Sequence, residues 1–167
     1  NEELIIEKKL ANLAKQDFKA HLLIVDSAST DSTLSKTKSW LEDYPGAFET
    51  WKIIPMSERK GKTTAVGLAL DELKEFEGII VMTDADATIM PGALTRINRW
   101  FSNPQVGAVG GTPQRTGDLG QETSHRELYT LLRVGESSHD STPFLEGSLL
   151  GWRSGLVSSS DLHYSAN

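Results

Sequence analysis

Short apolar runs alternate along the chain with longer segments whose apolar residues recur at helical spacing. The pattern predicts four strands, at residues 21–26, 51–55, 77–84 and 106–111. The first run shows no polar alternation, so we expect a strand that is buried on both faces. Pro55 places the second strand at an end or an edge, because proline cannot donate to the ladder. The third run is the strongest strand candidate.

Helical periodicity fills the intervals between these runs. We predict helices over about residues 2–15, 34–41, 65–76 and 94–101, and a fifth around Leu128, Leu131 and Leu132. Thr30 and Asp31 are the capping candidates for the second helix. Pro91 and Gly92 precede the fourth, where proline suits a first turn.

The order helix, strand, helix, strand is typical of parallel βαβ units. We therefore predict an α/β fold with a mostly parallel central sheet flanked by helices on both faces. In such sheets ligands bind beyond the carboxyl ends of the strands. Asp26 ends the first predicted strand and Asp84 ends the third. We expect both to face one crevice.

Composition narrows the function classes. The chain has 167 residues, a net charge of −6, no cysteine and 38% apolar residues. These values favour one soluble domain over residues 1–167, in the cytoplasm, and exclude disulfides and thiolate chemistry. The net acidity disfavours a nucleic-acid partner. The histidines are scattered, and there is no Gly-x-Ser-x-Gly motif, so neither a zinc site nor a serine hydrolase is expected.

The sharpest motif is the pair of carboxylates at Asp84 and Asp86, directly after an apolar strand. Two acids at this spacing can converge on one hard cation. Mg²⁺ and Mn²⁺ accept oxygen ligands and use one or two carboxylates together with substrate phosphates. The alternative is a solvated turn in which Asp86 or Thr88 caps the next helix.

Two further segments are candidates for binding a phosphorylated ligand. Asp26, followed by small polar residues, suits hydrogen bonding to a base or ribose, or else stabilises a turn. The basic loop at residues 58–64 lacks the P-loop pattern, because Met56 stands where that pattern needs glycine. It still suits an anion, through backbone N–H groups and Lys60 or Lys62, with a solvated basic turn as the alternative.

Taken in order, these segments resemble the family-2 glycosyltransferases with the Rossmann-like GT-A fold. The opening Asn-Glu-Glu resembles the end of the family's first motif, and the stretch after Val25 its V-D-D-G-S-T-D-x-T. The other matching segments are residues 60–62 with Ala65 and Leu68, residues 84–86 with 91–94, residues 106–111, and residues 147–153.

The resemblance implies transfer of a sugar from a UDP or GDP donor to the hydroxyl of a lipid or saccharide acceptor. It implies a divalent metal, Mn²⁺ or Mg²⁺, held at Asp86 and Asp84, which are also the catalytic candidates. The implied contacts to the nucleotide sugar are Asp26, Ser27, Lys60, Gly61 and Asp84. The implied acceptor side comprises Glu146, Gly147 and Arg153.

Two departures from the family pattern stand out. Ser27 occupies the position where the family most often has a second aspartate, next to the residue that lies near the nucleotide base. The family's acidic catalytic-base motif has no match after Arg153, where Asp161 is the only acid. We therefore expect a fragment that lacks the first strand and the C-terminal part, with the base beyond Asn167. The resemblance is compatible with membrane association of the full-length protein, at the cytoplasmic face.

Two rival functions compete. Asp84 to Thr88 also matches the D-x-D-x-T signature of haloacid-dehalogenase-type phosphatases, although no lysine follows Lys74. The non-enzymatic rival is a module that binds a nucleotide and performs no chemistry.

Overall fold

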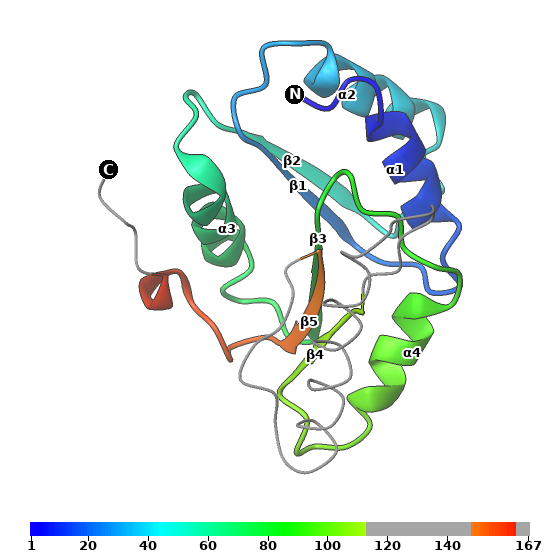
Figure 1. The fold of residues 1–167 in the computed structure, drawn as a ribbon, viewed down its shortest axis with the longest axis vertical. Helices are drawn as coiled ribbons and strands as arrows, with labels where there is room; N and C mark the ends of the chain where they lie inside the picture. Colours follow the sequence, from blue (N-terminus) through cyan, green and yellow to red (C-terminus); the bar gives the residue numbers. More distant parts are fainter. Residues whose placement is uncertain (113–147, 163–167) are drawn as a thin grey trace, which may run out of the picture.

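The computed structural model describes residues 1–112 and 148–162, and Figure 1 shows its arrangement. Helices and strands alternate through the first hundred residues, as predicted. The elements are α1 (Ile6–Ala14), β1 (Leu22–Asp26), α2 (Thr33–Asp43), β2 (Trp51–Pro55), α3 (Gly61–Glu72), β3 (Ile79–Thr83), α4 (Ala93–Trp100), β4 (Ala108–Gly110), β5 (Leu149–Arg153) and a 3₁₀ turn (Ser159–Asp161).

The strands form two sheets with different pairing. β1 and β2 are parallel, with Ile24 opposite Ile53. β5 lies between β3 and β4 and runs antiparallel to both. The predicted α/β class is confirmed, and β3 and β4 run in the same direction. The pairing is nevertheless mixed, because a strand from far along the sequence inserts between them.

Helices cover both faces of the parallel pair, as expected (Figure 1). On one face, the buried side chains of α1 and α2 form a core with Phe48. Its fully enclosed members are Leu10 and Leu41, each about 1% exposed. Leu22, Ile24 and Ile53 pack against them from the strands. On the other face, α3 contacts β1. Burying these side chains is the main stabilisation of this half of the fold.

A second group of buried residues lies where α4 packs on β5. Ile97 and Phe101 are buried, as the helical spacing predicted. Trp152, which follows Gly151 in β5, is also buried. The absence of a side chain at Gly151 permits this close approach. A Cβ built there would lie 3.1 Å from Ile97 and 3.5 Å from Phe101. The glycine thus sets the distance between helix and strand.

The predicted elements match those observed in order, with different limits. α2 covers Thr33–Asp43 rather than 34–41, and α3 covers Gly61–Glu72 rather than 65–76. The third strand covers Ile79–Thr83 rather than 77–84, and the fourth Ala108–Gly110 rather than 106–111. The strand β5 was not predicted. The predicted helix around Leu128 lies outside the described residues.

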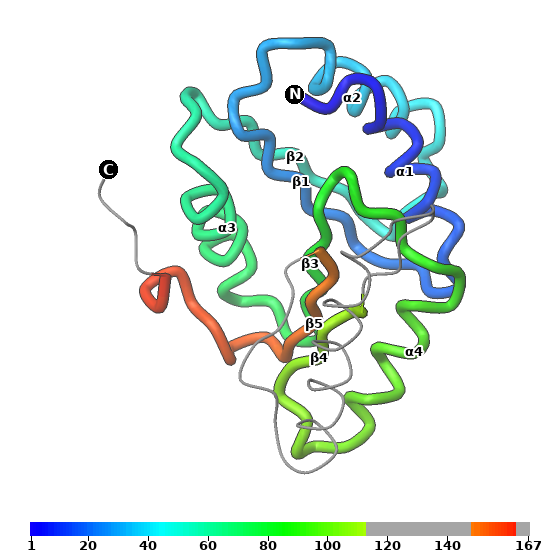
Figure 2. The backbone as a smooth tube through the Cα atoms, in the orientation of Figure 1, coloured from blue at the N-terminus to red at the C-terminus, as the bar shows by residue number. Residues whose placement is uncertain are grey.

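The chain leaves β1, β2 and β3 on the same side of the molecule, toward the top of the view in Figure 2. The segments that follow these strands carry Asp26, the basic loop and the Asp84–Asp86 pair. The fold therefore gathers the three predicted motifs on one side.

Candidate functional site

Asp84 and Asp86 lie in a tight turn directly after β3. The amide of Ala87 donates to the carbonyl of Asp84 at 3.3 Å, which closes the turn. Asp84 is half-buried and Asp86 is exposed. The predicted alternative was a solvated turn in which Asp86 or Thr88 caps the next helix. The turn and the exposure of Asp86 are present, whereas the capping is not, because α4 begins at Ala93 with Gly92 as its N-cap. Asp86 is thus left at the surface without a capping role.

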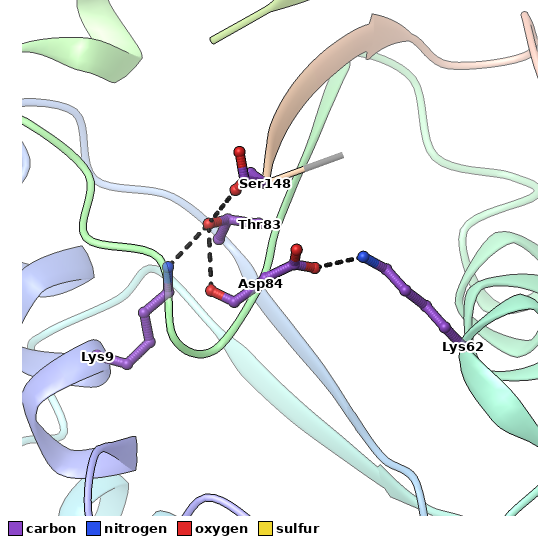
Figure 3. Close-up of polar contacts among 5 residues, drawn as sticks. All are labelled: Lys9, Lys62, Thr83, Asp84 and Ser148. Carbon is purple, nitrogen blue, oxygen red and sulfur yellow. Dashed lines mark hydrogen bonds and ion pairs between the residues drawn. The ribbon is translucent and has the colours of Figure 1, made fainter. Parts of the chain in front are cut away.

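Lys62 from the first turn of α3 binds Asp84. Its Nζ lies 2.6 Å from Asp84 Oδ1, and Figure 3 shows the two side chains meeting across the gap between α3 and β3. Lys60 instead pairs with Glu58 of its own loop at 2.6 Å. Of the two lysines that the sequence left open, Lys62 is therefore the one that reaches the acidic turn.

A second lysine contacts the same turn from the opposite side (Figure 3). Lys9 of α1 donates to Thr83 Oγ1 at 2.8 Å and to the carbonyl of Ala87 at 2.5 Å. Thr83 Oγ1 in turn donates to the carbonyl of Ser148 at 2.9 Å. The acidic turn is therefore tied to α1 and to the segment that enters β5.

The Lys9 side chain is buried, with 7% of the residue exposed. Desolvation lowers the pKa of this ammonium from 10.5 to about 8, although the charges of Asp84 and Asp86 oppose the shift. Lys9 therefore remains mostly a cation at neutral pH, and it interacts electrostatically with Asp84 and Asp86.

Two amide side chains extend this contact along α1. Asn12 donates to the carbonyl of Ile89 at 2.8 Å and accepts from the Ile89 amide at 2.8 Å. Gln16 also reaches the Ile89 carbonyl, at 3.4 Å. Lys9, Asn12 and Gln16 recur at i, i+3 and i+7, so they share one face of the helix. Sequence reasoning missed this polar stripe, whose spacing was its only signal.

Asp26 is buried at the end of β1 and belongs to a turn. Its Oδ2 accepts from the Ser29 amide at 3.0 Å, and its carbonyl accepts from Met56 at 2.8 Å. Ala28 within this turn has a φ of 55°, a conformation that non-glycine residues rarely adopt. This hydrogen bond supports the alternative in which Asp26 stabilises a turn. Ser27 lies within the same turn.

The chain's first residues pack against the segment that follows β1. The Glu2 amide donates to Thr33 Oγ1 at 2.7 Å, and the Glu3 amide donates to Asp31 Oδ2 at 3.3 Å. Thr33 donates its hydroxyl to Asp31 Oδ1, which, with lesser help from amide donors, lowers the pKa of Asp31. Asp31 thus joins α1 and α2 rather than lying free for a ligand.

Arg153 lies at the other end of β5 from the acidic turn. It pairs with Ile79 at the start of β3, whereas Leu149 pairs with Thr83. Its guanidinium donates to the carbonyls of Phe101, Val106 and Asn103 and stacks over the Phe101 ring. The structure therefore does not bring Arg153 together with Asp84. Glu146 and Gly147, the other acceptor-side predictions, lie outside the described residues.

The donor set at the turn fits a hard cation that is shared with a ligand. Within residues 1–112 and 148–162, no three His, Cys, Asp or Glu side chains gather as a complete metal site. Two neighbouring carboxylates match the usual protein share at a Mg²⁺ or Mn²⁺ site, whose remaining ligands are waters and substrate phosphates. The pair alone is therefore compatible with a metal that arrives with its substrate.

No curated protein and no solved structure matches this chain. Across the described part, no helix is long and apolar enough to cross a membrane.

The sequence profile described as glycosyl transferase family 2 matches residues 1–156. The match includes Asp84 to Thr88, so it assigns this segment to a glycosyltransferase domain rather than to the phosphatase that its D-x-D-x-T pattern also suited. A match over most of the chain, on an α/β fold with the predicted element order, shows the family: the chain belongs to glycosyl transferase family 2.

Proposed function

We propose that this domain binds a nucleotide-diphosphate sugar beyond the carboxyl ends of β1, β2 and β3 and takes part in transfer of its sugar to an acceptor hydroxyl. The observation that carries the proposal is the meeting of Lys62 and Asp84 at 2.6 Å, beside the exposed Asp86. A metal–diphosphate complex presents both cationic and anionic groups, and this cluster offers partners for both.

Each residue has a separate role in the proposal. Asp86 and Asp84 would hold Mn²⁺ or Mg²⁺, which supplies positive charge that stabilises the departing diphosphate. Lys62 would bind a phosphate oxygen. Its exposed ammonium sits on a long, flexible side chain that can move from Asp84 to an incoming anion.

Asp26, Ser27, Lys60 and Gly61 complete the proposed donor side. Ser27 carries a hydroxyl in the turn after β1, where it can hydrogen bond to a base or ribose. Gly61 opens α3 with a φ of 84°, so the loop turns sharply at the point where the helix exposes its first N–H groups. Lys60 adds a positive charge beside it. We propose UDP or GDP as the nucleotide.

The acceptor in this proposal is a lipid or a saccharide, and the site of action is the cytoplasm or the cytoplasmic face of a membrane. Glu146 and Gly147 stay in the proposed acceptor side. We do not include Arg153 in the proposed acceptor side, because its guanidinium donates to three backbone carbonyls at the end of β5 away from Asp84.

Calorimetric titration tests the donor site. UDP, GDP and their sugar conjugates are added to the chain with Mn²⁺ or with a chelator. We expect metal-dependent binding of at least one nucleotide, weakened about tenfold or more by Asp86→Ala. Asp43→Ala, an exposed acid at the end of α2, is the control and should bind as the parent does. Equal affinity with and without chelator would contradict the role of the carboxylates.

Turnover separates an enzyme from a module that only binds. Release of free UDP or GDP from the sugar conjugate, increased by an acceptor, would support transfer. Binding without any such release would favour the nucleotide-binding module for this chain.

A further inference from the structure

We propose that Lys9 is a positioning residue that fixes the turn carrying Asp84 and Asp86, so that helix α1 sets the geometry of the donor site. The inference rests on the proposed function and deepens it, because it names a residue that acts on the site from outside the predicted motifs.

The first argument is where the two hydrogen bonds of Lys9 fall. One goes to Thr83, the residue before the acidic pair, and the other to the carbonyl of Ala87, the residue after it. One ammonium therefore holds both ends of the turn. Figure 3 shows Lys9 reaching Thr83 from the side opposite Lys62, so the two lysines approach the turn from different elements.

The second argument is that α1 supplies the next support as well. Asn12 exchanges two hydrogen bonds with the backbone of Ile89, both at 2.8 Å, in the manner of a neighbouring strand. The residues between β3 and α4 form no regular element of their own. Their position therefore depends on this helix face.

The third argument is the cost of burying Lys9. A buried ammonium loses hydration, and a methionine of similar length would avoid that loss. Asp84 and Asp86 repel each other at their i, i+2 spacing, and a cation that interacts electrostatically with both offsets the repulsion. A lysine here thus provides what an apolar residue cannot: two directed hydrogen bonds and a charge opposite to the pair.

The experiment compares Lys9→Met with Lys8→Met, which removes the neighbouring lysine from the exposed face of α1. Hydrogen exchange followed by mass spectrometry reports on peptides that cover residues 84–90 of the ligand-free chain. Titration with UDP and Mn²⁺ reports on the donor site. Thr83→Val, which removes one acceptor of Lys9 and preserves shape, is the second variant if Lys9→Met does not fold.

We expect Lys9→Met to speed exchange in residues 84–90 about tenfold or more and to weaken Mn²⁺-dependent UDP binding by a similar factor. Lys8→Met should do neither. In the Asp86→Ala background, Lys9→Met should cost little further affinity, because the carboxylate that it positions is already gone. If Lys9 had a purely structural role, Lys9→Met would lower thermal stability. Its effect on UDP affinity would then be the same with and without Asp86→Ala.

Failure of the inference and failure of the proposed function give different results. If the parent chain binds no nucleotide, the proposed function fails, and exchange at residues 84–90 still decides whether Lys9 holds the turn. Unchanged exchange in both Lys9→Met and Thr83→Val would overturn the inference. So would a parent that binds UDP with Mn²⁺ and a Lys9→Met variant that binds it equally well.

Discussion

Lys62 and Asp84 stand 22 residues apart in the sequence, and their charged groups lie 2.6 Å apart in the fold. The pair joins the first turn of α3 to the turn after β3. Lys62 is 60% exposed and Asp84 33%, so solvent screens the pair and it adds little to stability. Its interest lies in the proposed function, because a metal ion bound at Asp84 would compete with a lysine that already neutralises this carboxylate.

Lys62→Met should have opposite effects on the binding of the metal and on the binding of the nucleotide. Without the competing ammonium, we expect Mn²⁺ alone to bind several-fold more tightly. UDP in the presence of Mn²⁺ should bind several-fold more weakly, because a phosphate partner is lost. Calorimetry with each ligand measures both effects. Lys60→Met is the control, since that lysine pairs with Glu58. Weaker binding of Mn²⁺ alone would contradict the competition.

The Lys9 ammonium makes a distinct contribution to the pH dependence of stability. Burial lowers its pKa to about 8 in the folded chain from 10.5 when exposed. Below pH 8 Lys9 is protonated in both the folded and the unfolded chain, and the folded chain carries the full free-energy cost of burying the charged ammonium. Between pH 8 and 10.5 only the unfolded state holds it, so stability rises with pH, by up to about 3 kcal/mol.

Urea unfolding of the parent and Lys9→Met across pH 7 to 10.5 isolates this contribution. We expect the free energy of unfolding of the parent to rise relative to that of the variant through this interval. A difference between the two that stays constant with pH would contradict a depressed pKa at Lys9.

Gly151→Val should destabilise the fold, because the space above this glycine is filled by α4. Its Cβ alone would lie 3.1 Å from Ile97, and two more methyl groups would force the helix away. We expect a loss of about 1–3 kcal/mol in the free energy of unfolding. Denaturant unfolding measures it, with Gly46→Val as the control, since nothing lies within 4 Å of a Cβ at Gly46. Equal losses would contradict the role of the close approach between α4 and Gly151.

Arg153→Met should reduce stability and spare the donor site. The substitution removes three hydrogen bonds to carbonyl oxygens and a contact with the Phe101 ring. We expect a loss of about 2 kcal/mol in the free energy of unfolding and an unchanged affinity for UDP with Mn²⁺. Thermal unfolding and calorimetry measure the two quantities. A large loss of affinity at unchanged stability would return Arg153 to the ligand site.

Most of the fold could be predicted from local signals. Apolar runs of strand length, separated by segments at helical spacing, gave β1 to β4 and α1 to α4 in order. The β5 strand was missed because its sequence, Leu-Leu-Gly-Trp-Arg, contains a glycine. It also lies far along the chain from the preceding strand, which ends at Gly110. Its identity as a strand comes from pairing with β3 and β4, to which it is remote in sequence.

The sequence by itself determined which residues could carry chemistry: the acidic pair at the end of a strand, Asp26 at another, and a basic loop before a helix. These signals are local, since each depends on a few neighbouring residues. Only the tertiary structure decided which lysine meets Asp84, which face of α1 supports the turn, and at which end of β5 Arg153 lies. Those outcomes depend on helix rotation and strand register, which packing between distant segments sets.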